Sequence, residues 1–124
     1  MRRSPSAHSA AALLTLAVCA SAQAADAERG KTLYESRCIA CHSVDHDRIG
    51  PRHRGLLGRK AGAVAGFDYS PALRTSKIVW NAKTLDAWLA NPERLIPGQR
   101  MNYSVPEAVD RADLILYLSA PSPN

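Results

Sequence analysis

The sequence is poor in aromatic residues and contains no long apolar run. Phenylalanine, tryptophan and tyrosine make up 6% of its 124 residues, and no stretch provides the ~20 consecutive apolar residues that a membrane-spanning helix needs. A single domain of this size buries too little apolar surface to be robust on its own. We therefore expect a large embedded prosthetic group to supply core volume, and no stable insertion into a membrane.

The sequence also lacks the concentrated positive charge of a nucleic-acid-binding protein. It has 16 basic and 11 acidic residues and a formal net charge of +5, but no dense Lys/Arg run and no basic patch interleaved with aromatics. Nucleic acid is therefore not an expected partner. The mild positive balance instead favours steering toward an acidic protein partner.

The N-terminal residues resemble a targeting segment rather than part of a fold. A basic start and an apolar stretch over residues 10–20 precede Ala22-Gln23-Ala24, a small-x-small cleavage site. This pattern is typical of a secretory signal peptide. We predict a cleaved signal peptide over 1–24, a domain over 25–120 and a frayed tail over 121–124, and hence export to the periplasm.

Cysteines are few, and their number is odd for an exported chain. Cys19 lies inside the leader and would be removed with it. Its retention as an acylated lipoprotein cysteine is the alternative, which Val18 disfavours because a small residue should precede such a cysteine. Cys38 and Cys41 then remain as a closely spaced pair.

The periodicity of apolar residues and the capping residues predict one all-α domain without internal repeats. Gly30 lies on the inner face of the first helix, where it would allow another element to approach closely. Glycines and prolines punctuate the middle of the chain, and such a long loop usually wraps a ligand. We expect helices over 26–38, 70–76 and 84–91. A last helix should open with a capping box at Ser104 and Glu107 and extend to about Leu118. We also expect a loop over 43–68 and a turn at Pro97-Gly98.

Cys38-Ile-Ala-Cys41-His42 matches the attachment pattern for c-type haem. Two thiols three positions apart can each add to a haem vinyl group, and the next residue places an imidazole beneath the iron. Three alternatives compete: a thioredoxin-like redox pair, a structural disulfide, and a zinc site completed by His46 or His53. Because no β-α-β pattern and no recognised zinc spacing accompany the pair, we predict one covalent haem c with its iron.

An electron-transfer haem needs a second axial ligand, and a thioether raises the reduction potential. Met101 is the only methionine besides the initiator, and it lies in the irregular segment Pro97-Gly-Gln-Arg-Met101. We therefore predict that Met101 binds the iron opposite His42. The alternatives are that Met101 is ordinary core filler, or that His46 or His53 completes a bis-histidine site.

These motifs and their surroundings resemble class I cytochrome c, of the mitochondrial and bacterial cytochrome c2 type, over about residues 26–118. The resemblance implies a small all-α fold in which the N- and C-terminal helices cross, while short helices and long loops wrap one covalent haem. Gly30 and Tyr34, facing Leu114 and Tyr117, are similar to the family's helix crossing.

The resemblance also assigns residues to the haem environment. Gly50-Pro51 is similar to the pair whose proline carbonyl accepts a hydrogen bond from the proximal imidazole. Arg59, Tyr69 and Trp80 would meet the propionates, with a solvated arginine and ordinary aromatic packing as the alternatives, and Trp88 occupies a distal-pocket position. The predicted cofactor-binding residues are Cys38, Cys41, His42, Pro51, Arg59, Tyr69, Trp80, Trp88 and Met101, with His42 and Met101 as iron ligands.

Three residues depart from the family pattern near the haem. Arg54 replaces a histidine, Leu73 replaces an asparagine, and Gln99 replaces a threonine of the distal loop. These changes leave the ligands intact but alter the hydrogen-bond network on the distal side.

With both axial positions filled, no substrate reaches the metal, so we expect a monomeric one-electron carrier and not an enzyme. The expected partners are redox proteins, namely a membrane oxidase or reductase complex or a periplasmic dehydrogenase. Two alternatives remain open: a dedicated electron-accepting subunit of one dehydrogenase, and a peroxidase or gas sensor if Met101 is easily displaced.

Overall fold

The computed structural model describes residues 22–120 together with Met1; residues 2–21 and 121–124, which include most of the predicted signal peptide and the predicted frayed tail, lie outside the described residues. The described part confirms the predicted all-α class. It contains an isolated antiparallel bridge between Lys60 and Val79 but no strand. The helices are α1 (Ala27–Arg37), α2 (Pro71–Thr75), α3 (Ala82–Ala90), α4 (Pro92–Leu95) and α5 (Ala108–Leu118).

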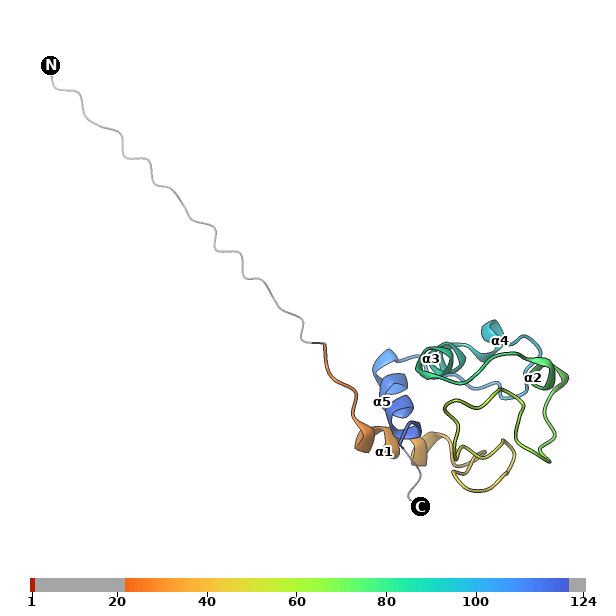
Figure 1. Cartoon of the computed structure of the whole chain (residues 1–124). Helices are drawn as coiled ribbons and strands as arrows, with labels where there is room; N and C mark the ends of the chain where they lie inside the picture. The colour runs from red at the N-terminus through yellow and green to blue at the C-terminus, as the bar shows by residue number, and fades with distance from the viewer. Residues whose placement is uncertain (2–21, 121–124) are drawn as a thin grey trace.

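Figure 1 shows α1 and α5 side by side, with α3 next to α5 and a wide loop connecting α1 to α2. That loop contains no helix, in agreement with the prediction for residues 43–68. Of the helices between residues 22 and 120, none is both long and apolar enough to cross a bilayer.

The first two helices begin within one residue of the predicted starts, because Asp26 and Ser70 are their N-terminal caps. Asp26 caps α1 by accepting hydrogen bonds from the N–H groups of Glu28 and Arg29 at 2.9 and 3.1 Å. Ser70 caps α2 by accepting from the N–H of Leu73 at 3.2 Å, with a proline in the first helical position. In both cases a side-chain oxygen satisfies N–H groups that have no partner within the helix.

The region around α3 and α4 differs from the prediction. Helix α3 begins at Ala82, not Thr84, because Asn81 and Thr84 form a reciprocal capping box with two 2.9 Å hydrogen bonds. Helix α4 was not predicted. It forms because Pro92 is preorganised for a first helical position and the Asn91 side chain accepts from the N–H of Arg94 at 3.0 Å.

The predicted capping box at Ser104 and Glu107 is wrong. Helix α5 begins at Ala108, and Glu107 makes no side-chain capping bond. Pro106 explains the shift, because a residue before proline is disfavoured in helical geometry and Val105 would have been the first helical residue. The Arg111 guanidinium instead donates to the carbonyls of Val105 and Pro106 at 3.0 and 2.7 Å.

Helices α1 and α5 meet at Gly30. A Cβ at this position would lie 2.0 Å from the Asp113 carbonyl oxygen and 3.0 Å from the Cβ of Tyr117. The ring of Tyr34 packs against that of Tyr117 at a centroid distance of 5.3 Å, and Leu114 is 1% exposed. This contact is the crossing that the resemblance implied.

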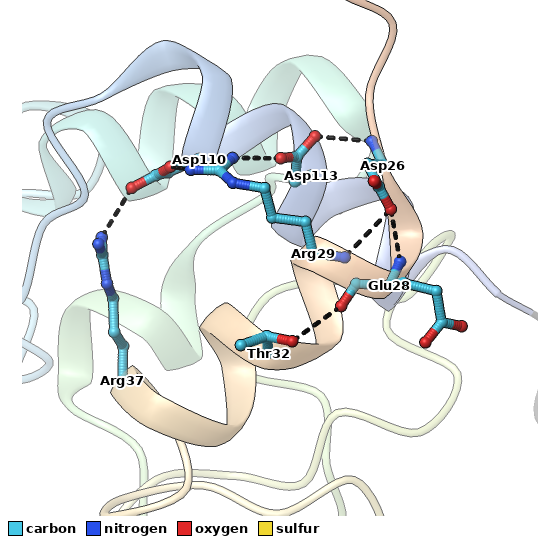
Figure 2. Close-up of polar contacts among 7 residues, drawn as sticks. All are labelled: Asp26, Glu28, Arg29, Thr32, Arg37, Asp110 and Asp113. Carbon is cyan, nitrogen blue, oxygen red and sulfur yellow. Dashed lines mark hydrogen bonds and ion pairs between the residues drawn. The ribbon is translucent and has the colours of Figure 1, made fainter.

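An ion-pair cluster joins the same two helices (Figure 2). Arg29 of α1 bonds both Asp110 and Asp113 of α5, and Arg37 contacts Asp110 at 3.0 Å. Asp113 also accepts from the N–H of Asp26 at 2.7 Å. The two carboxylates are almost fully buried. The hydrogen bond from the Asp26 N–H, followed by that from the Arg29 guanidinium, holds the pKa of Asp113 below its ordinary value.

Acid should therefore weaken this contact. A lowered carboxyl pKa stabilises the fold above the unfolded-state value of about 4, and this stabilisation is lost as the pH falls toward the lowered value. Asp113→Asn keeps an oxygen for the Asp26 N–H but loses the charge. Its unfolding temperature should lie below that of the wild type at pH 7, with a difference that shrinks by pH 3.

The matched control is Asp68→Asn. Asp68 is 85% exposed and contacts Arg74 and Arg100 at 3.3 and 3.7 Å, and exposed pairs contribute little to stability. This variant should unfold at nearly the wild-type temperature at both pH values. Equal effects of the two substitutions would contradict the assignment of acid sensitivity to the helix contact.

Candidate haem site

A cavity of about 360 Å³ lies between the two terminal helices, the long loop, α2, α3 and the segment after α4. Its wall is mainly apolar, and all nine residues predicted to bind the cofactor line it. The volume falls within the range of small-molecule and cofactor sites.

Cys38 and Cys41 lie at the end of α1. Cys38 is the C-terminal cap of the helix, and its carbonyl accepts from the N–H groups of Cys41 and His42 at 3.1 and 2.8 Å. This tight turn brings both thiols and the imidazole to one wall. The two cysteines form no disulfide with each other, and Cys41 is exposed.

The environment of the pair argues against thioredoxin-like chemistry. Burial raises the pKa of the Cys38 thiol to about 11, whereas a redox-active thiol needs a lowered pKa. The pair also follows a helix and not a strand. For zinc, residues 22–120 contain no cluster of three or more His, Cys, Asp or Glu side chains that could hold a metal ion.

The His42 ring is fixed in orientation by its second nitrogen. Nδ1 lies 2.8 Å from the carbonyl oxygen of Pro51, so Nδ1–H donates and Nε2 keeps its lone pair for a metal. Burial lowers the pKa of His42, which also favours the neutral, metal-binding form. Gly50 leaves room for the ring: a Cβ there would lie 2.2 Å from Cε1 and 2.6 to 2.7 Å from the two ring nitrogens.

His53 is a site residue whose position the sequence did not reveal. Its ring stacks on that of His42 at a centroid distance of 4.2 Å and an interplanar angle of 25°. Its Nδ1 hydrogen-bonds the Tyr34 hydroxyl at 3.0 Å. Burial, followed by the nearby His42 and Arg59, lowers the pKa of His53 to about 3, so the ring is neutral. A ligand opposite His42 must lie across the iron from it, and His53 lies alongside it.

The long loop contains a further histidine. His46 is exposed and does not line the wall. The two histidines offered as alternative ligands therefore differ in position, and neither is placed to lie opposite His42.

The predicted ligand Met101 and the two predicted tryptophans also line the cavity. Met101 lines the cavity and packs against the larger core cluster. Trp80 and Trp88 belong to that cluster, with ring centroids 5.4 Å apart at 58°. They form an aromatic surface against which a flat macrocycle can pack.

Arg59 and Tyr69 leave hydrogen-bond donors available at the cavity. Two N–H groups of the half-buried Arg59 donate to the carbonyls of Arg54 and Arg52 at 3.0 and 2.8 Å, and a guanidinium has five. Among the described residues, no ion pair involves Arg59. The Tyr69 oxygen accepts from the N–H of Val64 at 3.2 Å, which leaves its own proton to donate.

These donors match the anionic part of haem. Burial lowers the pKa of Arg59, because a partly buried cation without an anion is unfavourable. A carboxylate in the cavity would supply the missing charge. An apolar cavity with a free imidazole nitrogen, two thiols and unused donors therefore fits a haem with its propionates.

The three departures from the family pattern have different surroundings. Arg54 pairs with Asp45 at the surface, so its substitution does not touch the cavity. Leu73 is buried and lines the wall, making it more apolar. Gln99 is 7% exposed and hydrogen-bonds both Asn102, which follows Met101, and Glu93 of α4.

A helical shell around one apolar cavity, with a Cys-x-x-Cys-His segment in its wall, defines the class of proteins with covalently attached haem. The cytochrome c family model matches residues 27–120. Cytochrome c 2.1 of Caenorhabditis elegans is 43% identical over 102 residues, covering 80% of this chain and 92% of that relative. Cytochrome c of Arabidopsis thaliana is 40% identical over 97 residues, covering 75% of this chain and 87% of that relative.

A solved structure gives the same result. Cytochrome cH from Methylobacterium extorquens matches with a TM-score of 0.71 and 34% sequence identity, covering 75% of this chain and 96% of that one. The chain belongs to the cytochrome c family, whose members are electron carriers. Its cofactor is haem c, attached through Cys38 and Cys41.

Proposed function

We propose that this protein is a periplasmic one-electron carrier in which His42 and Met101 are the axial ligands of the iron. Bound haem supplies reversible exchange of one electron between Fe(III) and Fe(II). The observation that carries the proposal is that both side chains line one cavity, while Nδ1 of His42 is held by Pro51. With haem bound, the His42 imidazole and the Met101 thioether would both hold the iron and leave it no open position for a substrate.

The other predicted residues surround the cofactor. Arg59, Tyr69 and Trp80 bind the propionates, and Trp88 packs in the distal pocket. Arg59 and Tyr69 line the cavity and have hydrogen-bond donors that no group of the described residues uses. A propionate would accept from these donors and neutralise the Arg59 charge. A largely apolar wall keeps water away, so that little reorganisation accompanies a change in iron charge.

Export is part of the proposal. The basic start, apolar stretch and small-x-small site within residues 1–24 support secretion, and covalent attachment prevents loss of the cofactor outside the cytoplasm. The exposed Cys41 lies at the cavity edge, where a redox partner can approach the macrocycle. We propose that the monomer serves a membrane oxidase or reductase complex, or a periplasmic dehydrogenase.

The decisive experiment is production of the full chain together with a haem-ligation system. The secreted protein should be coloured, should begin near Ala25, and should retain its pigment in acidified organic solvent because thioethers do not dissociate. Its oxidised spectrum should be low-spin with the weak long-wavelength methionine-to-iron charge-transfer band. Colourless protein, extractable pigment or a high-spin spectrum would contradict the proposal.

Kinetics separate a shuttle from a dedicated subunit. A shuttle should exchange electrons rapidly with more than one purified partner, and the rates should fall as ionic strength rises if charge steers the encounter. Rapid exchange with one dehydrogenase alone would contradict the shuttle function.

A further inference from the structure

The loop that carries Met101 is held by side chains, not by its own backbone. From residue 100 to residue 104, all within the described range, no backbone N–H or carbonyl takes part in a backbone–backbone hydrogen bond. The flanking anchors are Gln99, whose N–H donates to Ile96 at 3.3 Å, and Val105, whose N–H donates to Leu89 at 2.7 Å. Met101 therefore depends on other contacts for its position.

Gln99 provides those contacts through its amide group. Its oxygen accepts from the backbone N–H of Asn102 at 2.9 Å, and its nitrogen donates to Asn102 Oδ1 at 2.8 Å. The same nitrogen donates to Glu93 Oε2 at 3.2 Å, and the other Glu93 oxygen accepts from the N–H of Gly98 at 3.0 Å. The amide thus bridges residues on both sides of Met101 and ties them to α4.

Burial and backbone geometry make this arrangement specific. Gln99 is only 7% exposed, so losing a partner leaves a buried polar group unsatisfied. Asn102 has a φ of +49°, a left-handed conformation that asparagine tolerates better than most residues. The two amide side chains lock the strained residue that directly follows Met101.

We propose that Gln99, through its two hydrogen bonds to Asn102, is a positioning residue that holds the Met101 sulfur against the iron and so sets how often the sixth coordination position opens. The proposal rests on the proposed function, in which Met101 is the ligand. With the bridge intact, the backbone on either side of Met101 is fixed, so the loop cannot carry the sulfur away from the iron without breaking these hydrogen bonds. The bridge thereby favours electron transfer over reaction with small exogenous ligands.

The test is the rate at which imidazole binds the ferric holoprotein. At high imidazole concentration, this rate is limited by departure of Met101 from the iron, which a purely structural role for Gln99 would not alter. Gln99→Leu, similar in size but unable to hydrogen-bond, should raise the limiting rate by about tenfold or more, the factor expected from losing one or two hydrogen bonds.

Variants of Asn102 test the same bridge from its other end, even if Gln99→Leu fails to fold. Asn102→Gly removes the Oδ1 acceptor while tolerating the positive φ, and it should also speed imidazole binding. Asn102→Asp retains the acceptor and should bind at nearly the wild-type rate. Fast binding by the glycine variant alone would support the bridge, whereas equal rates for the two variants would overturn it.

Thr84→Val is the matched control, because it removes hydrogen bonds away from the Met101 loop: Thr84 Oγ1 accepts from the N–H of Asn81 and donates to the carbonyl of Val79, both at 2.9 Å. It should lower the unfolding temperature and leave the imidazole rate unchanged. A Gln99→Leu protein that keeps the charge-transfer band and binds imidazole at the wild-type rate would overturn the bridge alone. A wild-type protein without that band would overturn both the ligand assignment and the bridge.

Discussion

Replacing Met101 by alanine is expected to leave the haem attached but to abolish the charge-transfer band and lower the reduction potential. Attachment depends on Cys38 and Cys41, so the protein should remain coloured. The thioether favours Fe(II) relative to harder ligands, and axial ligands tune haem potentials over ~0.8 V. We expect a fall of about a tenth of a volt or more, measured by potentiometric titration.

Met101→Leu distinguishes ligation from packing. Leucine conserves the apolar volume, and such exchanges in a core usually cost less than about 1.5 kcal/mol. If Met101 binds iron, the leucine variant should have the altered spectrum and potential of Met101→Ala, with an unfolding free energy closer to the wild type. A leucine variant with the wild-type spectrum would show that Met101 only fills space beside the core cluster.

Both Met101 variants should also bind imidazole at once, without the delay set by departure of a protein ligand. This separates them from Gln99→Leu, in which the sulfur is still present and binding is faster but still limited. Together the two results would separate the roles of the two residues at the sixth coordination position. Met101 closes this position, and Gln99 governs how long it stays closed.

Features set by neighbouring residues in the chain could be predicted. Ser70 was recognisable as a helix cap because the N–H group that it caps lies three residues away. The wall containing Cys38, Cys41 and His42 was likewise specified by a short motif, and Gly30 indicated a close helix contact before its partner was known. Each signal is local, so the three-dimensional fold adds little to it.

Features created by residues far apart in the chain could not be predicted from the sequence. Nothing in the Arg-His-Arg run around His53 indicates that its ring lies on His42 and bonds Tyr34, 19 residues earlier. The bridge between Gln99 and Asn102 depends on the positive φ of Asn102, which no turn motif in the sequence predicts. The error at Ser104 was different: a capping pattern was present, but Pro106 prevented the helix from starting there.

Gly50→Ala should have the second large effect, because this glycine lies against the His42 ring. Its φ is not in the left-handed region, so alanine suits its backbone, and the obstacle is the contact with the ring. A Cβ 2.2 Å from Cε1 forces the ring or the loop to move. That movement should weaken the hydrogen bond from Nδ1 to Pro51, and disrupting such a bond typically costs roughly 10- to 100-fold in metal affinity or activity.

The matched comparison is Gly30→Ala, since both glycines lack room for a Cβ but touch different partners. At Gly30 the obstacle is the Asp113 carbonyl at 2.0 Å. This variant should lose about 1 to 3 kcal/mol of unfolding free energy, while its folded fraction keeps the wild-type haem spectrum. Gly50→Ala should instead change the low-spin electron paramagnetic resonance signal or reduce the yield of holoprotein. An unchanged signal and yield in Gly50→Ala would mean that the loop yields easily and that the ring orientation does not depend on Gly50.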